Sequence, residues 1–301
     1  MRVTNASMLN NFLSDTQNGL QKINKLSTQL NTGKQVNKVS DNPYEAIKII
    51  NLQNEINSVE RQNYNINEIT GWVDTTDSAL DKIGNITSEI KVLLTSISGS
   101  YGKDEINAIK AEVNEKIKQI GEALNTTYAG KYIFGGSNTN EAPVSIIENA
   151  DGLAQLKINS LSNNDKLQVE ISDGITINYN LSINQVLNNG EGLDTINNII
   201  IELNKDPIDM DEIQNLMRET DKYLNNVLNN RSTIGAKSNT LENVKASNEK
   251  HILTMKEAFS NIQDVDFTEK YIELKSAEFV YSSSMQVGAR LIQPTLLDYL
   301  R

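Results

Sequence analysis

The feature that most limits the fold of this chain is a very long run of apolar residues spaced three and four positions apart. The run starts at Ile49 and continues to Ile97, and it changes phase once, near Thr76. Spacing of this kind places apolar side chains along one face of an α-helix. A helix over residues 45–97 would be roughly 75 Å long at ~1.5 Å per residue. Because such a helix is not stable alone in water, the pattern predicts that it packs against partner helices.

The same spacing returns later in the chain and supplies those partners. It recurs in three segments, at 106–124, 196–203 and 213–259. A short break separates the first of these from the long run, which predicts an antiparallel return. The expected fold class is therefore mainly α, with a long antiparallel helical rod that resembles a coiled-coil bundle and is built from both ends of the chain. We assign residues 46–131 and 191–264 to this rod domain.

Residues 132–190 have a different pattern, in which apolar and polar residues alternate with period two. The alternation occurs in three short stretches, at 156–158, 167–171 and 175–179. Turn signals separate these stretches at Asn164-Asp165 and at Asp173-Gly174. The segment is therefore predicted to be a small β-rich insertion at one end of the rod.

The two ends of the chain carry narrower apolar stripes. An N-terminal helix is expected to end at Gly33, because glycine readily adopts the left-handed conformation that closes a helix. A C-terminal helix is expected to start at Asp266, with Glu269 in a capping arrangement three residues later. Stripes this narrow bury little surface within one molecule. We therefore separate residues 1–45 and 265–301 as terminal helical arms.

Composition excludes several classes of chemistry. The chain has no cysteine and one histidine, His251, so thiol chemistry and a His/Cys zinc site lack their residues. A formal net charge of −11 opposes binding to nucleic acid, and no stretch is apolar enough to span a membrane. No catalytic, cofactor-binding or metal-binding residue is predicted. We therefore expect a protein that is not an enzyme and uses no cofactor.

Five blocks of the sequence, taken in order, are similar to those of the flagellin superfamily. They are QLNTGKQVNKVSDNPYEA (29–46), DTTDSAL (74–80), NTTYAGKYIFGGSNT (125–139), RSTIGAKSNTLE (231–242), and the C-terminal stretch that runs from DVDFTEKYIELKSAEFVYSSS to LLDYL. Within the superfamily, the chain looks like the hook-associated subunits of the hook–filament junction. Filament subunits usually have Asp-Asp-Ala-Ala-Gly where this chain has Ser40-Asp41-Asn42-Pro43. One departure is Val39, which stands where the family has proline.

The resemblance implies a structural subunit of the bacterial flagellum that forms the junction between hook and filament. It also implies secretion, unfolded and without a cleaved signal, through the flagellar type III apparatus. The expected partners are the first hook-associated protein, flagellin or the filament cap, further copies of the chain in a ring, and an export chaperone. Neither nucleic acid nor a membrane is an expected partner. Two alternatives remain open at this point, a short flagellin that forms the filament itself and a cytoplasmic coiled-coil adaptor.

A junction subunit of this kind would assemble through its terminal arms. We expect these arms to be poorly ordered in the isolated monomer and to fold by packing between neighbouring subunits. The residues assigned to the assembly contacts are the apolar positions of the two arms, namely Leu13, Leu20, Ile23, Leu30, Ile272, Phe279, Val287, Leu291 and Leu297.

Overall fold

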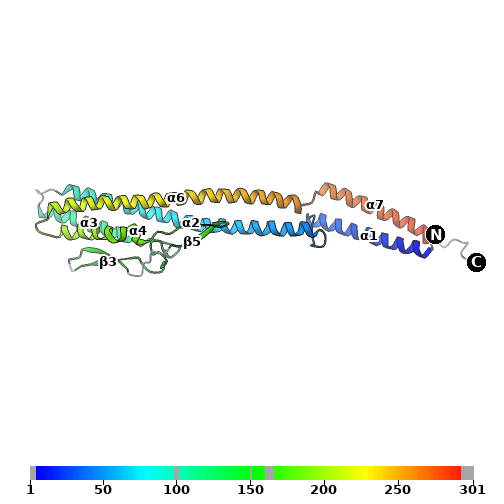
Figure 1. Ribbon diagram of the computed structural model, residues 1–301, viewed down its shortest axis with the longest axis horizontal. Helices are drawn as coiled ribbons and strands as arrows, with labels where there is room; N and C mark the ends of the chain where they lie inside the picture. Colours follow the sequence, from blue (N-terminus) through cyan, green and yellow to red (C-terminus); the bar gives the residue numbers. More distant parts are fainter. Residues whose placement is uncertain (1–4, 98–101, 150, 160–165, 293–301) are drawn as a thin grey trace, which may run out of the picture. The chain divides into compact units, whose positions relative to one another are not determined.

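The computed structural model describes residues 5–97, 102–149, 151–159 and 166–292 of the 301. This part of the chain is mainly helical, with long helices from both ends and a small β-rich segment (Figure 1). The helices are α1 (Asn5–Thr32), α2 (Pro43–Ser96), α3 (Lys103–Leu124), α4 (Ile183–Val186), α5 (Glu191–Leu203), α6 (Met210–Gln263) and α7 (Phe267–Ile292), with a 3-10 turn at Asn188–Gly190. The predicted fold class, mainly α with a β-rich insertion, is confirmed.

The chain divides into two compact units, each of which is described by itself. The terminal unit comprises residues 1–58 and 251–301, and the central unit comprises residues 59–250. Each unit takes part of α2 and part of α6. This division into two units follows from how the chain packs. The boundaries of the arms, the rod and the insertion follow from sequence patterns, and they stay a prediction.

The core of the central unit is built from the apolar stripe of α2 and the helices that cover it. Leu80 and Ile83 of α2 are completely buried, and so are Ile117 of α3 and Ile234 of α6. The change of phase expected near Thr76 does not interrupt α2. Thr76 is buried, and its hydroxyl donates to the backbone oxygen of Trp72 at 2.8 Å. The buried hydroxyl group thus finds its hydrogen-bond acceptor within α2, and the helix continues without a break.

Charged side chains join the helices of the central unit at fixed positions. Arg231 of α6 donates to two carboxylates of α2, with 2.9 Å between Nε and Asp77 Oδ1 and 2.5 Å between Nη1 and Asp81 Oδ1. One helical turn separates the two aspartates, so a single guanidinium bridges both. Lys91 of α2 pairs in the same way with Asp221 of α6, at 2.5 Å. These pairs hold α2 and α6 in one relative register.

Within the described residues, the strands form three separate antiparallel hairpins. They are β1 (Thr127–Tyr128) with β2 (Lys131–Tyr132), β3 (Val144–Glu148) with β4 (Ala154–Ile158), and β5 (Gln168–Ser172) with β6 (Ile175–Asn178). The predicted turn at Asp173-Gly174 joins β5 to β6, and Gly174 has a φ of 70°. The turn predicted at Asn164-Asp165 lies outside the described residues. The three stretches of alternating residues correspond to β4, β5 and β6.

The hairpins are attached to the helices of the central unit by packing and by side-chain hydrogen bonds. A Cβ atom on Gly121 of α3 would lie 2.8 Å from side-chain carbons of Ile146 and Leu156, so glycine lets the β3–β4 hairpin approach the helix closely. Gln62 Nε2 donates to Asp173 Oδ1 at 2.7 Å, at the turn of the β5–β6 hairpin. The insertion is therefore held against the helices of its own unit.

Candidate assembly site on the terminal helices

In the terminal unit, α1 and α7 form an antiparallel pair whose close contacts recur every seven residues. A Cβ atom on Gly288 would lie only 2.0 Å from the ring of Phe12, and one on Gly19 would lie 3.5 Å from the ring of Tyr281. Leu26, seven residues beyond Gly19, is buried. A seven-residue repeat keeps the same helix faces together along the pair. The inner face of α1 therefore contains Phe12, Gly19 and Leu26.

At one end of this pair, α1 ends next to Gly33 and α7 begins after Asp266. Gly33 has a φ of 68°, in the left-handed region, and its oxygen accepts from the backbone of Val265 at 3.1 Å. The Asp266 carboxylate accepts from the backbone N–H groups of Thr268 and Glu269, at 2.8 and 3.2 Å. The helix end expected at Gly33 and the helix start expected at Asp266 are both confirmed.

The loop between α1 and α2 is organised by Asp41 and Asn42. The backbone N–H of Lys38 donates to Asp41 Oδ2 at 3.0 Å, and Lys25 Nζ lies 3.4 Å from Asp41 Oδ1. The hydrogen bond from Lys38, together with the charge of Lys25, lowers the pKa of Asp41 below its ordinary value. Asn42 Oδ1 accepts from the backbone of Glu45 at 3.3 Å and so caps α2. Asn42 therefore caps the helix, whereas Asp41 closes the turn.

A lowered pKa at Asp41 predicts an acid-sensitive turn. Since the carboxylate is favoured in the folded state, its stabilisation is present above the ordinary aspartate pKa of about 4 and is lost as the pH falls through the lowered value. We expect the carboxyl carbon of Asp41, followed by NMR, to titrate at a lower pH in the folded chain than in a free peptide of residues 34–45. The variant Asp41→Asn assigns the signal. Equal titration in chain and peptide would contradict this account of the turn.

The structure describes the side chains of seven of the nine predicted assembly residues. Leu13 and Leu20 of α1 are exposed, and Ile23 and Leu30 are half-buried. On α7 the exposed residues are Ile272, Phe279 and Val287, and the exposed fraction reaches 71% for Phe279. Leu291 belongs to α7, but its side chain is not described, and Leu297 lies outside the described residues. The exposed members are surface apolar side chains, so their role in assembly stays a prediction.

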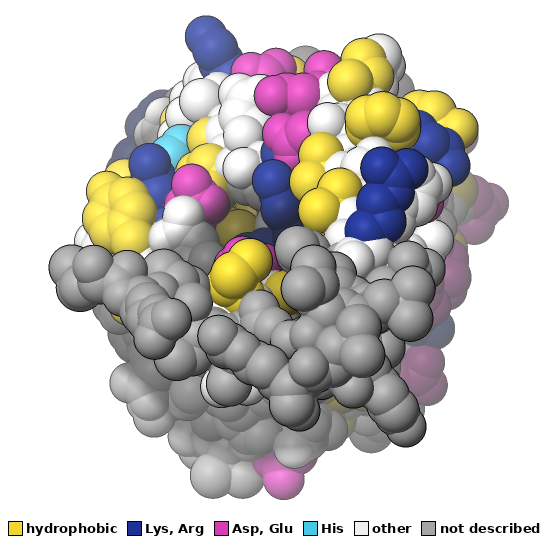
Figure 2. Space-filling view, turned by 90° about the vertical axis from the view of Figure 1, so that its right-hand side faces the viewer, with side chains coloured by type: hydrophobic (Ala, Val, Ile, Leu, Met, Phe, Trp, Pro, Cys, Tyr) yellow, Lys and Arg dark blue, Asp and Glu magenta, His cyan; other side chains and the backbone are white. Residues whose placement is uncertain are grey.

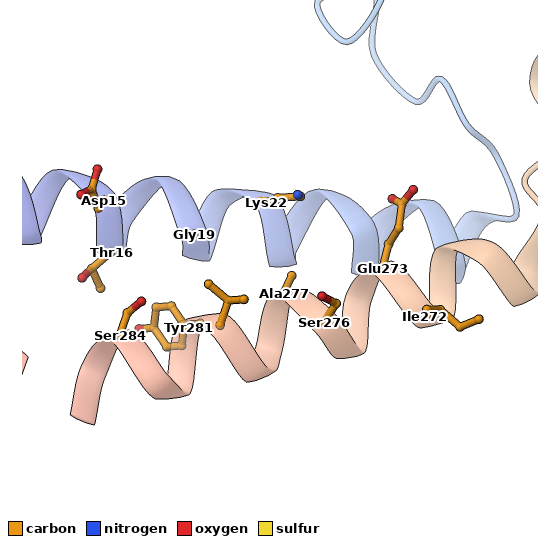
Figure 3. Close-up of a pocket in the computed structure, with 11 residues that line it drawn as sticks. Asp15, Thr16, Gly19, Lys22, Ile272, Glu273, Ser276, Ala277, Tyr281 and Ser284 are labelled. Atoms are coloured by element: carbon orange, nitrogen blue, oxygen red, sulfur yellow. The ribbon is translucent and has the colours of Figure 1, made fainter. Parts of the chain in front are cut away.

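A groove of 370 Å³ lies between α1 and α7 and adds to this surface (Figure 3). Its lining combines small residues with apolar and charged ones. The small residues include Gly19, Ser276 and Ala277, the apolar ones include Ile272 and Val280, and the charged ones are Asp15, Lys22 and Glu273. The predicted residue Ile272 is therefore part of the groove wall. Small residues leave room for a side chain from another helix, so the groove can accept an apolar residue of a partner.

Several further apolar residues of the same two helices are exposed and were not predicted from the sequence. They are Met8 and Leu9 on α1, with Tyr271, Val280 and Met285 on α7. Two of them keep the helical spacing, Leu9 at four residues before Leu13 and Val280 at seven residues before Val287, so spacing alone could have indicated these two. Figure 2 shows hydrophobic side chains that reach the surface between charged ones, on the face seen from the right of Figure 1.

The terminal unit has a formal net charge of zero. Residues 1–58 and 251–301 carry 11 basic and 11 acidic side chains, so the whole net charge of −11 belongs to residues 59–250. Copies of an unbalanced unit would repel one another on close packing, and this unit avoids that cost. An apolar, neutral surface of this kind is suited to contacts with other protein chains.

Comparison with known families matches both ends of the chain. A model of the bacterial flagellin N-terminal helical region matches residues 3–139, and a model of the flagellin C-terminal helical region matches residues 217–300. The two matches together span well over half of the sequence. The chain belongs to the flagellin family. The role of this family in the bacterial flagellum is structural, and the resemblance of the five sequence blocks is thereby confirmed.

Relatives of this flagellin-family chain include both filament and hook-associated proteins. It is 24% identical to a flagellin of Listeria innocua over 293 residues, which are 95% of each chain. It is 22% identical to flagellar hook-associated protein 3 of Salmonella typhimurium over 287 residues, which are 89% of each chain. Both alignments extend over nearly the whole sequence.

Solved structures share the fold of this flagellin-family chain. A flagellar hook-associated protein from Vibrio parahaemolyticus superposes with a TM-score of 0.66 at 21% identity, covering 74% of this chain and 100% of the other. FlgL from Bacillus cereus superposes with a TM-score of 0.57 at 19% identity, covering 70% and 99%. The solved structures therefore share the fold over 74% and 70% of this chain.

Two further observations concern the described residues only. In that part of the chain, no group of three or more His, Asp or Glu side chains is arranged to hold a metal ion. No described helix is long and apolar enough to cross a membrane.

The close contact at Gly288 predicts a large effect of a small substitution. In Gly288→Val the added side chain would overlap the ring of Phe12, so we expect α7 to separate from α1 at this point. Hydrogen exchange of the α1 and α7 amides should then become faster. The matched control is Gly235→Val, because nothing lies within 4 Å of a Cβ at Gly235 of α6. Unchanged exchange in α1 and α7 of Gly288→Val would show that this contact does not hold the pair together.

Proposed function

We propose that the chain is the structural subunit that joins the hook to the filament of the bacterial flagellum. The observation that carries the proposal is the fold, which matches the whole solved chain of a flagellar hook-associated protein, over 74% of this chain, with a TM-score of 0.66. The relationship to hook-associated protein 3 of Salmonella typhimurium, over 89% of each chain, supports it. So does the turn sequence Ser40-Asp41-Asn42-Pro43, which differs from that usual in filament subunits.

Assembly proceeds through the terminal helices in this proposal. Leu13 and Leu20 on α1, with Ile272, Phe279 and Val287 on α7, expose apolar surface that one subunit alone does not bury. Burying it against neighbours is favourable by about 25 cal/mol for each Å² removed from water. The partners are further copies in a ring, the first hook-associated protein on one side, and flagellin or the cap on the other.

We further propose that the subunit leaves the cell as an unfolded chain. The subunit is secreted through the flagellar type III apparatus, with an export chaperone covering its apolar arms before transport. The absence of cysteine from the sequence suits this route, since a chain without thiols cannot form crosslinks during passage. The arms would then become fully ordered when they pack between neighbouring subunits.

Deletion of the gene tests the junction role directly. A deletion strain should assemble hooks without filaments and release flagellin into the medium, because filament subunits have nothing to attach to. Complementation with the intact gene should restore filaments. Filaments of normal length and number on the deletion strain would refute the proposal.

A second candidate is a short flagellin, and the Listeria innocua relative favours it, since that flagellin matches 95% of the chain. Purified subunits separate the two functions. A filament subunit added to short filament seeds should extend them into long filaments, whereas a junction subunit should bind hook ends and stop after limited addition. Mass spectrometry of detached hook–basal bodies should find the junction subunit with the hook.

A further inference from the structure

The central unit contains an aromatic cluster around Trp72, the single tryptophan of the sequence. The ring centroid of Trp72 lies 6.1 Å from that of Tyr128 and 5.7 Å from that of Tyr179, with interplanar angles of 75° and 88°. These are edge-to-face contacts, which fix the relative orientation of aromatic rings. Trp72 is buried, and both tyrosines are half-buried. Part of the surface of each tyrosine is therefore accessible to solvent, whereas the indole ring of Trp72 is covered.

A cavity of 380 Å³ opens beside this cluster. Its apolar lining includes the three aromatic residues, and its polar lining consists of Glu68, Lys131, Ser137 and Thr139. Small-molecule sites in proteins typically have volumes of about 300–1,000 Å³, with apolar walls and a few polar groups. The size and the lining of this cavity both fall within that description.

Local backbone geometry holds the walls of the cavity in place. A Cβ atom on Gly71 would lie 2.2 Å from Tyr128 Oη, so a glycine at this position of α2 lets the tyrosine lie against the helix. Tyr128 and Lys131 are paired across the β1–β2 turn, where Ala129 and Gly130 have φ values of 49° and 78°. The turn thereby places an aromatic ring and a cation at the same side of the cavity.

The chemistry of the lining indicates the class of ligand. Glu68 and Lys131 carry opposite charges and no net charge together, which disfavours an anion such as phosphate as well as a simple cation. Both are exposed on the surface, where a carboxylate accepts and an ammonium donates hydrogen bonds. Aromatic surfaces beside such groups suit a molecule with apolar C–H faces and a rim of hydroxyls.

We propose that this cavity binds a short neutral saccharide. Tyr128 and Tyr179 contact the C–H face of a sugar ring, Glu68 accepts from its hydroxyls, and Lys131 donates to its oxygens. Trp72 forms the rear wall. This binding activity is independent of assembly through α1 and α7, because every residue of the cavity lies in the central unit.

The position of Trp72 provides the test, since its emission is the only tryptophan signal of the protein. The full-length chain is titrated with maltose, cellobiose and N,N′-diacetylchitobiose. We expect a saturable change of emission with at least one of them, with half-saturation at about 1 mM or below, as the size of such ligands implies. No saturable change with any of the three sugars would overturn the proposal.

Variants then separate binding from a general effect on the fold. Tyr179→Ala should weaken binding at least about tenfold, as loss of a good aromatic contact does. Glu68→Gln keeps the size of an exposed side chain and should weaken binding without changing the emission of the free protein. The matched control is Tyr64→Ala, because Tyr64 is an exposed tyrosine of α2 that does not line the cavity. Equal affinity in Tyr179→Ala and Tyr64→Ala would place the sugar elsewhere, and saturation by choline in place of the sugars would indicate a cation site.

Discussion

Replacing Phe279 by serine should strongly weaken assembly while leaving the fold of the isolated subunit intact. Among the predicted assembly residues whose side chains the structure describes, Phe279 is the most exposed, at 71%. Its burial against a neighbour is worth about 1.5–3 kcal/mol, so its loss should raise the concentration needed for assembly about 10- to 100-fold. We expect a deletion strain that expresses Phe279→Ser to show few filaments by electron microscopy and small swarming halos.

Val92→Ser is the matched control for this substitution. Val92 of α2 is 67% exposed, but it belongs to the central unit. Filaments should form normally with this variant. Circular dichroism and thermal unfolding of both purified variants should match those of the native subunit, because exposed substitutions usually change stability by less than about 0.5 kcal/mol. Normal filaments with Phe279→Ser would remove this residue from the assembly surface, and a lower melting temperature would show that it packs within the subunit.

Leu80→Ala should cause a large loss of stability in the central unit. Leu80 is completely buried in the core formed by α2, α3 and α6. Truncation of a buried leucine removes transfer free energy and leaves a cavity, which together cost about 2–5 kcal/mol. Urea unfolding followed by the emission of Trp72, in the same unit, should show this loss as a lower midpoint with little change in slope.

The same truncation at Leu228 of α6 separates burial from residue type. Leu228 is 49% exposed, so little of its side chain is removed from water on folding. Leu228→Ala should change the free energy of unfolding by less than about 1 kcal/mol. A similar loss in both variants would mean that the long helices pack differently from the arrangement described for the central unit.

Much of the helical architecture was predictable because it depends on local chemistry. The three-and-four spacing from Ile49 to Ile97 follows directly from the period of the α-helix, and α2 spans it without a break. Gly33 and Asp266 were recognisable as helix boundaries because a left-handed residue and a capping carboxylate act on their nearest neighbours. The predicted strands likewise correspond to β4, β5 and β6.

Other features depend on contacts between residues far apart in the chain. The choice between Asp41 and Asn42 as the cap of α2 was open, since both side chains are suited to that position. The structure resolves it because Lys25 and the backbone of Lys38 engage Asp41, which leaves Asn42 to accept from Glu45. The aromatic cavity was not predicted at all. Trp72 and Tyr179 are more than 100 residues apart in the sequence, and no periodicity connects them.

The sequence by itself therefore determined that the chain forms long amphipathic helices at both ends and that these belong to a flagellar structural family. Only the tertiary structure decided which apolar residues stay available for partners. On α1 the stripe contained Leu13 and Leu20 together with Ile23 and Leu30, and spacing could not distinguish them. In the structure, Phe12 and Gly19 face α7, which leaves Leu13 and Leu20 exposed. The physical reason is that periodicity defines an apolar face, whereas the partner helix determines how much of that face is buried.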